Sequence, residues 1–484
     1  MALGEVDYGL MGVVGGLTAF ISFLNGIMAS GVGRFYAISV GAAKNDPING
    51  LEKCREWFTT AVVIHTVLPV LLMLIGYPIG EWAVRHFLTI PPDRVEACVW
   101  VWRFTCLNCF VGMASVPYHA MYGAHQEIAE LTIYSFATTT FNVIFLYYVI
   151  NHPGDWLVRF AIWGSILSVT PSLIITTRAF LKYKECRFLK KYINSCWARV
   201  KEMLAYSGWL FIGVMGDLLS GQGMAVLINK FFGPRVNAAV NIGNTLSGHC
   251  TTLAGSLTGA FWPVITNAYG AGDYEAVKVY AYRVSRLATF LVLIFALPLA
   301  LEVDEVLVLW LKTPPLYASG ICLCALSVAV IDKTSFGYAI AAHANGKIGL
   351  YISVAGGLFL LALPLAWLFL SMGLSVYWAM IAILITRSMT AFARVCLAKR
   401  LVHTSVRYWV SKILLPLVVI GGAGVMVGML PKFIMQASFL RVCLTTLLVE
   451  IVLVPLAWKF MFDFAEKSFV LSKLPSGLRS YLER

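Results

Sequence analysis

The sequence has few charged residues for a chain of 484 residues. Asp, Glu, Lys and Arg together make up 13%, whereas hydrophobic residues make up 59% and the mean hydropathy is +0.79. Soluble domains contain roughly 25% charged and 45–50% apolar residues. The shortage of charge therefore excludes a soluble globular protein and indicates a chain that lies mostly within a membrane.

The sequence also lacks the common motifs of catalysis. It contains no GxSxG nucleophile elbow, no HExxH zinc motif and no P-loop, and its glycine pairs, such as Gly356-Gly357, lie in apolar segments. Close helix packing explains such glycines better than phosphate binding. Cys106 and Cys109 have CxxC spacing but no nearby His or carboxylate cluster, so we interpret them as packing residues. We expect no enzyme activity, no metal and no cofactor.

A basic leader is absent as well. Residues 1–10 contain Glu5 and Asp7 but no Lys or Arg, whereas a signal peptide begins with a basic region. This stretch has the composition of a loop between two helices.

What is present is a series of long apolar segments. A bilayer core about 30 Å thick needs roughly 20 helical residues to cross it, and helices satisfy their own backbone hydrogen bonds there. The sequence therefore predicts an all-α polytopic membrane protein with thirteen transmembrane helices. They are expected at 9–41, 56–79, 98–119, 131–150, 156–178, 206–229, 237–267, 285–301, 317–340, 349–370, 376–397, 412–430 and 438–459.

The distribution of Lys and Arg predicts the orientation. One set of alternate loops holds 25 of the 37 basic residues and the opposite set holds 7, the other 5 being within segments. The richer set is expected in the cytoplasm. The net charge of +13 is then a topology signal, not a sign of nucleic-acid binding. The densest basic stretch, 178–201, is expected to be a cytoplasmic linker that faces membrane lipids.

One pattern of the chain occurs twice. Gly41-Ala42-Ala43 and Gly270-Ala271-Gly272 each precede a charged loop and an apolar helix with a Leu-Pro pair, and the offset is 229 residues at both marks. An even number of segments separates the copies, which predicts two parallel bundles. We expect an N-terminal bundle at 1–180, a linker at 181–205, a second bundle at 206–400, and a terminal helix pair with a tail at 401–484.

Several short motifs, in order, resemble the multidrug/oligosaccharidyl-lipid/polysaccharide (MOP) exporter superfamily. The chain is most similar to its polysaccharide and O-antigen (Wzx-type) flippases of lipid-linked oligosaccharides. The motifs are Leu3-Gly4 with Asp7-Tyr8-Gly9, Arg34-Phe35, Gln222-Gly223, Phe231-Phe232-Gly233-Pro234, and Tyr269-Gly270-Ala271-Gly272-Asp273. The resemblance implies a MATE-like fold of fourteen helices. The first motif follows helix one in that family, so the resemblance and the repeat both predict a helix before residue 1 that this chain lacks.

Ionisable residues inside membrane helices mark candidate sites. Arg34 could bind a pyrophosphate in a cavity through its planar fork, or extend to the interface. Arg103 follows Trp100 and Trp102, so it could anchor the interface or face a cavity. Arg387 lies in the middle of its segment, where a lipid-facing arginine is costly, so we expect a cavity or a paired position.

Three further ionisable residues lie within predicted spans. Asp217 could pair with a cavity arginine, carry a coupling H⁺ or Na⁺, or make a structural hydrogen bond. Asp332 and Lys333 are adjacent on a helix and point about 100° apart. Asp332 is a second coupling candidate, and Lys333 is a further candidate for substrate binding. The cationic excess within the spans favours an anionic substrate.

The resemblance implies a multi-pass protein of the bacterial inner membrane that moves a polyprenyl-pyrophosphate-linked glycan outward by alternating access, coupled to H⁺ or Na⁺. The substrate would enter a cationic cavity between the bundles. A cation-coupled multidrug antiporter of the same superfamily is the first alternative. A polysaccharide polymerase or ligase is the second, although the predicted external loops are short.

Overall fold

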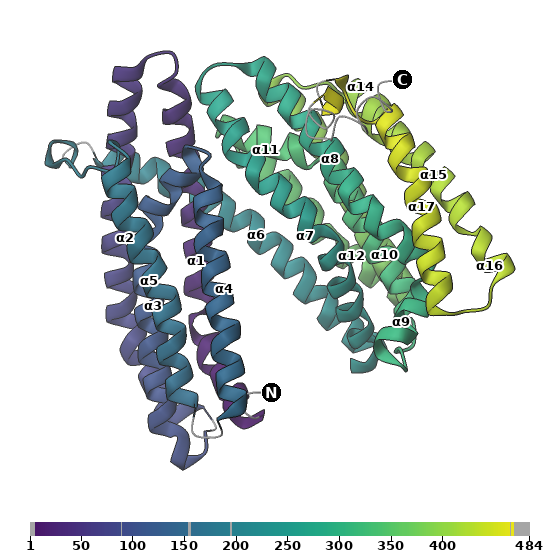
Figure 1. The fold of residues 1–484 in the computed structure, drawn as a ribbon, viewed down its shortest axis with the longest axis horizontal. Helices are drawn as coiled ribbons and strands as arrows, with labels where there is room; N and C mark the ends of the chain where they lie inside the picture. Colours follow the sequence, from purple (N-terminus) through teal and green to yellow (C-terminus); the bar gives the residue numbers. More distant parts are fainter. Residues whose placement is uncertain (1–4, 89, 153–155, 194–195, 465, 469–484) are drawn as a thin grey trace. The chain divides into compact units, whose positions relative to one another are not determined.

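The computed structural model describes residues 5–88, 90–152, 156–193, 196–464 and 466–468, and within these ranges it is helical without strands. Figure 1 follows the helices from purple to yellow. The helices of the first half are α1 (Glu5–Ala42), α2 (Pro47–Trp82), η1 (Ala83–Phe87), η2 (Pro92–Arg94), α3 (Val95–Ala124), α4 (Ile128–Asn151), α5 (Leu157–Lys182), η3 (Lys190–Tyr192) and α6 (Cys196–Phe232). Those of the second half are α7 (Pro234–Gly270), α8 (Tyr274–Leu301), α9 (Val303–Leu311), α10 (Ala318–Thr334), α11 (Phe336–Asn345), α12 (Gly349–Ser371), α13 (Val376–Val402), α14 (Val406–Trp409), η4 (Val410–Leu414), α15 (Leu415–Gly428), α16 (Leu430–Ile434) and α17 (Phe439–Phe460).

Each predicted apolar segment falls on helix. Ten spans of the described chain are long and apolar enough to cross a membrane, and the bent pair α10 and α11 makes an eleventh. The other two predicted segments coincide with α1 and α7. Helix α7 has 37 residues but recurrent Asn, Ser, Thr and Gly, which make it more polar. The helix predicted before residue 1 lies outside the described residues.

Two details differ from the prediction. The segment 317–340 is a bent pair whose axes differ by 45°. Side chains satisfy the backbone at this break, because the Trp409 indole donates to the Thr334 carbonyl (3.0 Å) and the Gly337 amide donates to Ser285 Oγ (3.0 Å). In addition, the predicted external loop 302–316 contains the short helix α9.

The described chain forms two compact units. Unit 1 comprises residues 1–211 and 266–273, and unit 2 comprises 212–265 and 274–484. The bundle boundaries predicted at 180 and 206 stay a prediction. In unit 1, a core between α2, α3 and α5 includes Trp102, Cys106 and Leu157. The apolar window of α4 is not buried at all, as expected of a helix facing lipid.

The turns predicted to be cytoplasmic meet at one end of unit 1. The Asn45 side chain donates to the Ala271 carbonyl (2.7 Å), and the Asn267 side chain donates to the Ala124 carbonyl (2.9 Å). The Arg55 guanidinium donates to the Lys184 carbonyl (3.2 Å). These bonds join the α1–α2 turn to the α7–α8 turn, the end of α7 to the end of α3, and α2 to the basic linker.

The two marks of the sequence repeat contact each other in unit 1. A methyl group added at Gly41 would lie 2.0 Å from the carbonyl oxygen of Asn267, and one added at Gly270 would lie 2.2 Å from that of Ile38. Position 267 is 229 residues after position 38, and 270 is 229 after 41. The contact is therefore reciprocal, and it explains why both copies have glycine there.

Unit 2 is built around α8, α10, α12 and α13, together with parts of α6 and α7. Helices α15 and α17 pack on α8 through a second core that includes Phe290, Ile420 and Leu453. The Glu302 carboxylate is fully buried and accepts from Arg441 (2.8 Å) and Thr445 (2.8 Å) of α17. The predicted terminal pair is thus bound to the helices of unit 2 by both apolar contact and an ion pair.

Candidate functional site

Small residues on α6 bring it close to α12 in unit 2. A methyl group at Gly216 would lie 3.3 Å from the Cα of Gly356, and one at Gly213 would lie 3.1 Å from Ile352. One helical turn further, Ser220 Oγ donates to the Phe359 carbonyl (2.8 Å). Small residues permit this approach between membrane helices. The approach holds Asp217, which follows Gly216, beside the residues that project from α12 and α13.

Asp217 pairs with Arg387 across the helices. The Arg387 guanidinium donates to the Asp217 carboxylate, and it also lies over the Phe359 ring, 3.9 Å from the ring centre. The Arg387 side chain is 22% exposed and that of Asp217 is 50% exposed. One face of the guanidinium is therefore covered by the ring, while the acid that neutralises it remains open to the cavity.

A second pair lies two turns along α13. Arg394 is seven residues after Arg387, so both project from the same side of the helix. Arg394 donates to Asp332 of α10 (2.7 Å), and its side chain is 11% exposed. Its guanidinium carbon lies 5.9 Å from the centre of the Phe359 ring. The two pairs link α6, α13 and α10 around Phe359.

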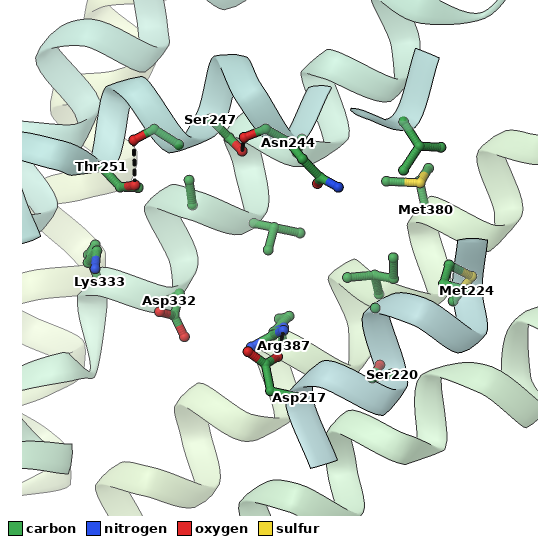
Figure 2. A pocket seen from close by; sticks show the side chains of 17 residues that line it. Asp217, Ser220, Met224, Asn244, Ser247, Thr251, Asp332, Lys333, Met380 and Arg387 are labelled. Carbon is green, nitrogen blue, oxygen red and sulfur yellow. Dashed lines mark hydrogen bonds and ion pairs between the residues drawn. The ribbon is translucent and has the colours of Figure 1, made fainter. Parts of the chain in front are cut away.

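Asp217, Arg387 and Asp332 border a cavity of about 470 Å³ within unit 2. Figure 2 shows Asp217 and Arg387 on one wall and Asn244, Ser247 and Thr251 of α7 on the other. The hydroxyls of Ser247 and Thr251 donate to carbonyls of their own helix, at 3.1 and 2.9 Å. Their oxygen lone pairs, and the Asn244 amide, remain to bind a polar ligand.

Lys333 completes the charged lining. It lines the cavity together with Asp332, and its ammonium lies 4.5 Å from the centre of the Phe336 ring. Among the charged lining residues, Asp217 and Asp332 balance Arg387 and Lys333. The cavity wall thus carries fixed charges of both signs in equal number, not a plain excess of positive charge.

The other two predicted site residues lie in unit 1. The Arg34 side chain is buried on α1, with its guanidinium carbon 4.7 Å from the Tyr206 ring centre and 5.0 Å from that of Phe35. Arg103 donates to Glu81 (3.3 Å) and lies over the Trp100 ring. It borders an apolar groove of about 590 Å³ between α2 and α3. Neither residue lines the unit 2 cavity, and their roles in substrate binding stay a prediction.

Sequence reasoning missed two parts of this site. Arg394 was not among the candidate residues, but it lies inside α13 and pairs with Asp332. The polar face of α7 was also missed. Asn244, Ser247, Gly248 and Thr251 recur at helical spacing, so a search for polar as well as apolar periodicity would have found this face.

Comparison with known proteins identifies the fold. No family model and no curated protein matches the sequence. Solved structures of MOP-superfamily transporters do match, each over 83% of this chain. One is a MATE in its straight conformation (TM-score 0.61, 13% identity, 89% of that chain). Another is a multidrug resistance MATE family transporter in its outward-facing conformation (0.62, 13%, 89%). A third is a MOP superfamily transporter from Pyrococcus furiosus with a binding pocket described as reversed in polarity (0.63, 15%, 91%). The chain therefore has a MATE-like fold.

Proposed function

We propose that this protein is a membrane transporter that carries a polyprenyl-pyrophosphate-linked oligosaccharide from the inner to the outer leaflet of the bacterial inner membrane by alternating access. The observation that carries the proposal is the mixed lining of the unit 2 cavity. Arg387 and Lys333 supply positive charge, while Asn244, Ser247 and Thr251 supply amide and hydroxyl groups. Arginine binds phosphate through two parallel hydrogen bonds, and the amide and hydroxyls suit a glycan.

The membrane setting strengthens the proposal. Ionisable groups within membrane helices are costly and occur mainly where they pair or line a pathway. The cavity gathers four of them on helices that are otherwise apolar. The solved structures with this fold are transporters, which supports a transport role over a polymerase or ligase. The reversed pocket polarity described for the Pyrococcus furiosus protein supports the view that this fold accommodates pockets of different charge.

A cation-coupled multidrug antiporter is the second candidate. Asp217 and Asp332 both line the cavity, and a carboxylate there could bind an organic cation, H⁺ or Na⁺. Both carboxylates are engaged by arginines, however, so a cationic substrate would have to compete with Arg387 or Arg394. We therefore rank this candidate second, and a role of the two aspartates in cation coupling stays a prediction.

The test is a flipping assay in proteoliposomes with a fluorescent polyprenyl-pyrophosphate-linked oligosaccharide, scored by accessibility of the label in the outer leaflet. We expect transport by the native chain and a loss of at least about tenfold in Arg387→Gln, because one hydrogen-bonded charge contact is worth about 1.5–3 kcal/mol. Arg159→Gln is the matched control. Arg159 lies over the Trp156 ring at the start of α5, and its loss should leave transport intact.

Two results would count against the proposal. Undiminished flipping by an Arg34→Ala, Arg387→Ala double variant would remove the case for a cationic cavity. Export of organic cations by the same proteoliposomes, with no movement of the lipid-linked glycan, would establish the antiporter instead.

A further inference from the structure

Asp217 has a geometry that the transport proposal alone does not require. We propose that Asp217 is a specificity-determining residue that occupies the anion-binding edge of Arg387 until the phosphate groups of the substrate displace it. The inference rests on the proposed function, because it concerns the same cavity and the same anionic substrate. Asp217 would act as an internal competitor that only a strong anion can replace.

The first support is the restricted access to Arg387. A guanidinium presents five N–H donors in one plane, and its two faces make no hydrogen bonds. In this structure the Phe359 ring lies 3.9 Å from the guanidinium carbon and covers one face. Binding must therefore take place along the edge, and Asp217 already occupies part of that edge. A carboxylate and a phosphate use the same edge in the same bidentate manner, so they compete for it.

The second support is the contrast with the neighbouring pair. Asp217 is 50% exposed, whereas Asp332 is 25% exposed and its partner Arg394 is 11% exposed. A half-exposed carboxylate that leaves its arginine is hydrated at once and loses little. The second pair has less compensation, because separating it would leave the largely buried Arg394 guanidinium without its partner. Exchange is therefore expected at Arg387 and not at Arg394.

The third support is the fixed position of the α6 backbone at Asp217. It follows Gly216, whose Cα approaches the Gly356 backbone, and it precedes Ser220, which is bonded to the Phe359 carbonyl. The backbone of α6 is thus held against α12 on both sides of Asp217. A change of partner at Arg387 then requires only rotation of two side chains, with no movement of the helix.

Discrimination between ligands follows from this exchange. A neutral glycan cannot replace a carboxylate on Arg387, because it would exchange an ion pair for a weaker neutral hydrogen bond. A pyrophosphate can, because it brings several negative charges. Asp217 would therefore exclude sugars that lack the pyrophosphate link, at the expense of some affinity for the correct substrate.

The experiment is a double-mutant cycle on the purified full-length chain in nanodiscs, with inorganic pyrophosphate as the probe and calorimetric titration as the readout. We expect Asp217→Asn to bind pyrophosphate about tenfold more tightly than the native chain, Arg387→Gln to bind it weakly, and the double variant to bind as weakly as Arg387→Gln. Asp304→Asn removes the same charge at an exposed position of α9 and should leave binding unchanged. Size-exclusion profiles confirm folding, and Asp217→Ser replaces Asp217→Asn if the latter aggregates.

The cycle separates competition from a general field effect. If Asp217 merely repels anions through space, its removal will tighten binding equally in the Arg387→Gln background, and the inference is overturned. It is also overturned if Asp217→Asn binds pyrophosphate no better than the native chain does. If no variant binds pyrophosphate while the proteoliposomes export organic cations, the proposed function itself fails.

Discussion

Arginines in the two units of this protein are held in different ways. Arg34 of unit 1 lies against the Phe35 and Tyr206 rings, and Arg103 lies over the Trp100 ring and donates to Glu81 of α2. Arg387 and Arg394 of unit 2 are joined to carboxylates on other helices. The number of arginines in the predicted spans therefore does not determine the net charge of a site. A count of arginines predicted a cationic cavity, whereas the structure neutralises each cavity arginine locally.

The same contrast holds at the ends of the helices. In unit 2, Arg286 is 2% exposed and donates to Tyr408 (2.8 Å), Asp463 and Glu466 (2.7 Å), which joins α8 to α14 and to the chain after α17. In unit 1, Arg178 pairs with Glu130 but remains 53% exposed. Arg286 thus joins buried helices of unit 2, whereas Arg178 of unit 1 makes its ion pair at the surface.

The largest expected effect tests this contrast directly. Removal of one partner from a buried ion pair costs about 3–5 kcal/mol, because the remaining charge stays without compensation. An exposed pair contributes about 0–1 kcal/mol. We therefore expect Arg286→Gln to lower the free energy of unfolding by several times as much as Arg178→Gln, measured by denaturant unfolding in mixed micelles. Equal losses would show that the two units use charge alike.

The next prediction concerns the contacts that stabilise unit 1. We expect close backbone contact to do so. Gly41→Ala should destabilise unit 1 by about 1–3 kcal/mol, because the added methyl meets the Asn267 carbonyl and the backbones must separate. Gly33→Ala on the same helix is the matched control, since its added methyl meets no atom within 4 Å beyond its chain neighbours and the nearby backbone of its own helix. A thermal unfolding series that ranks the two alike would contradict this explanation.

The smallest effect concerns a surface cluster of unit 1. Glu127, in the turn between α3 and α4, accepts from Lys182 and from the Tyr183 hydroxyl (2.7 Å), and the hydrogen bond from Lys182 holds the pKa of Glu127 below its usual value. A carboxyl whose pKa is lowered by folding stabilises the fold above its unfolded pKa of about 4.3 and loses that contribution as the pH falls through the folded value.

The native chain should therefore lose stability relative to Glu127→Gln as the pH falls from about 5 to about 3. Melting temperatures of both proteins across this range give the measurement, and parallel curves would exclude the contribution. Because Glu127 is 39% exposed and its ion pair lies at the surface, we expect a difference of a degree or so, well below the first two effects.

Much of the fold could be predicted from the sequence, and less of the site. Apolar runs of about 20 residues are unambiguous, so every predicted segment fell on helix. The bend at Ser335 was not predictable, because its stability depends on Trp409 and Ser285 from distant helices. Arg286, Arg394 and Arg441 lie near the ends of predicted segments and were not identified as candidates, and only the fold reveals their acidic partners.

The pairings themselves show why the site was harder. Asp217 and Arg387 are 170 residues apart, and Asp332 and Arg394 are 62 apart. Asp217, Asp332 and Arg387 were identified as costly charges within spans, and Arg394 was not. No local pattern in the sequence indicates which arginine pairs with which aspartate. The pairing depends on the close approach of α6 to α12 at their glycines, and on the position of Arg387 and Arg394 on the same side of α13.

The reciprocal contact of Gly41 and Gly270 has the symmetry of a homodimer interface, although both copies belong to one polypeptide. In an isologous interface, residue i of one subunit meets residue j of the other, and j meets i. Here position 41 meets the equivalent of position 38 in the other copy, and the reverse also holds. In a true homodimer, a single mutation would damage both contacts at once. In this chain a single mutation introduces one clash instead of two, because positions 41 and 270 are separate in the sequence and can change one at a time.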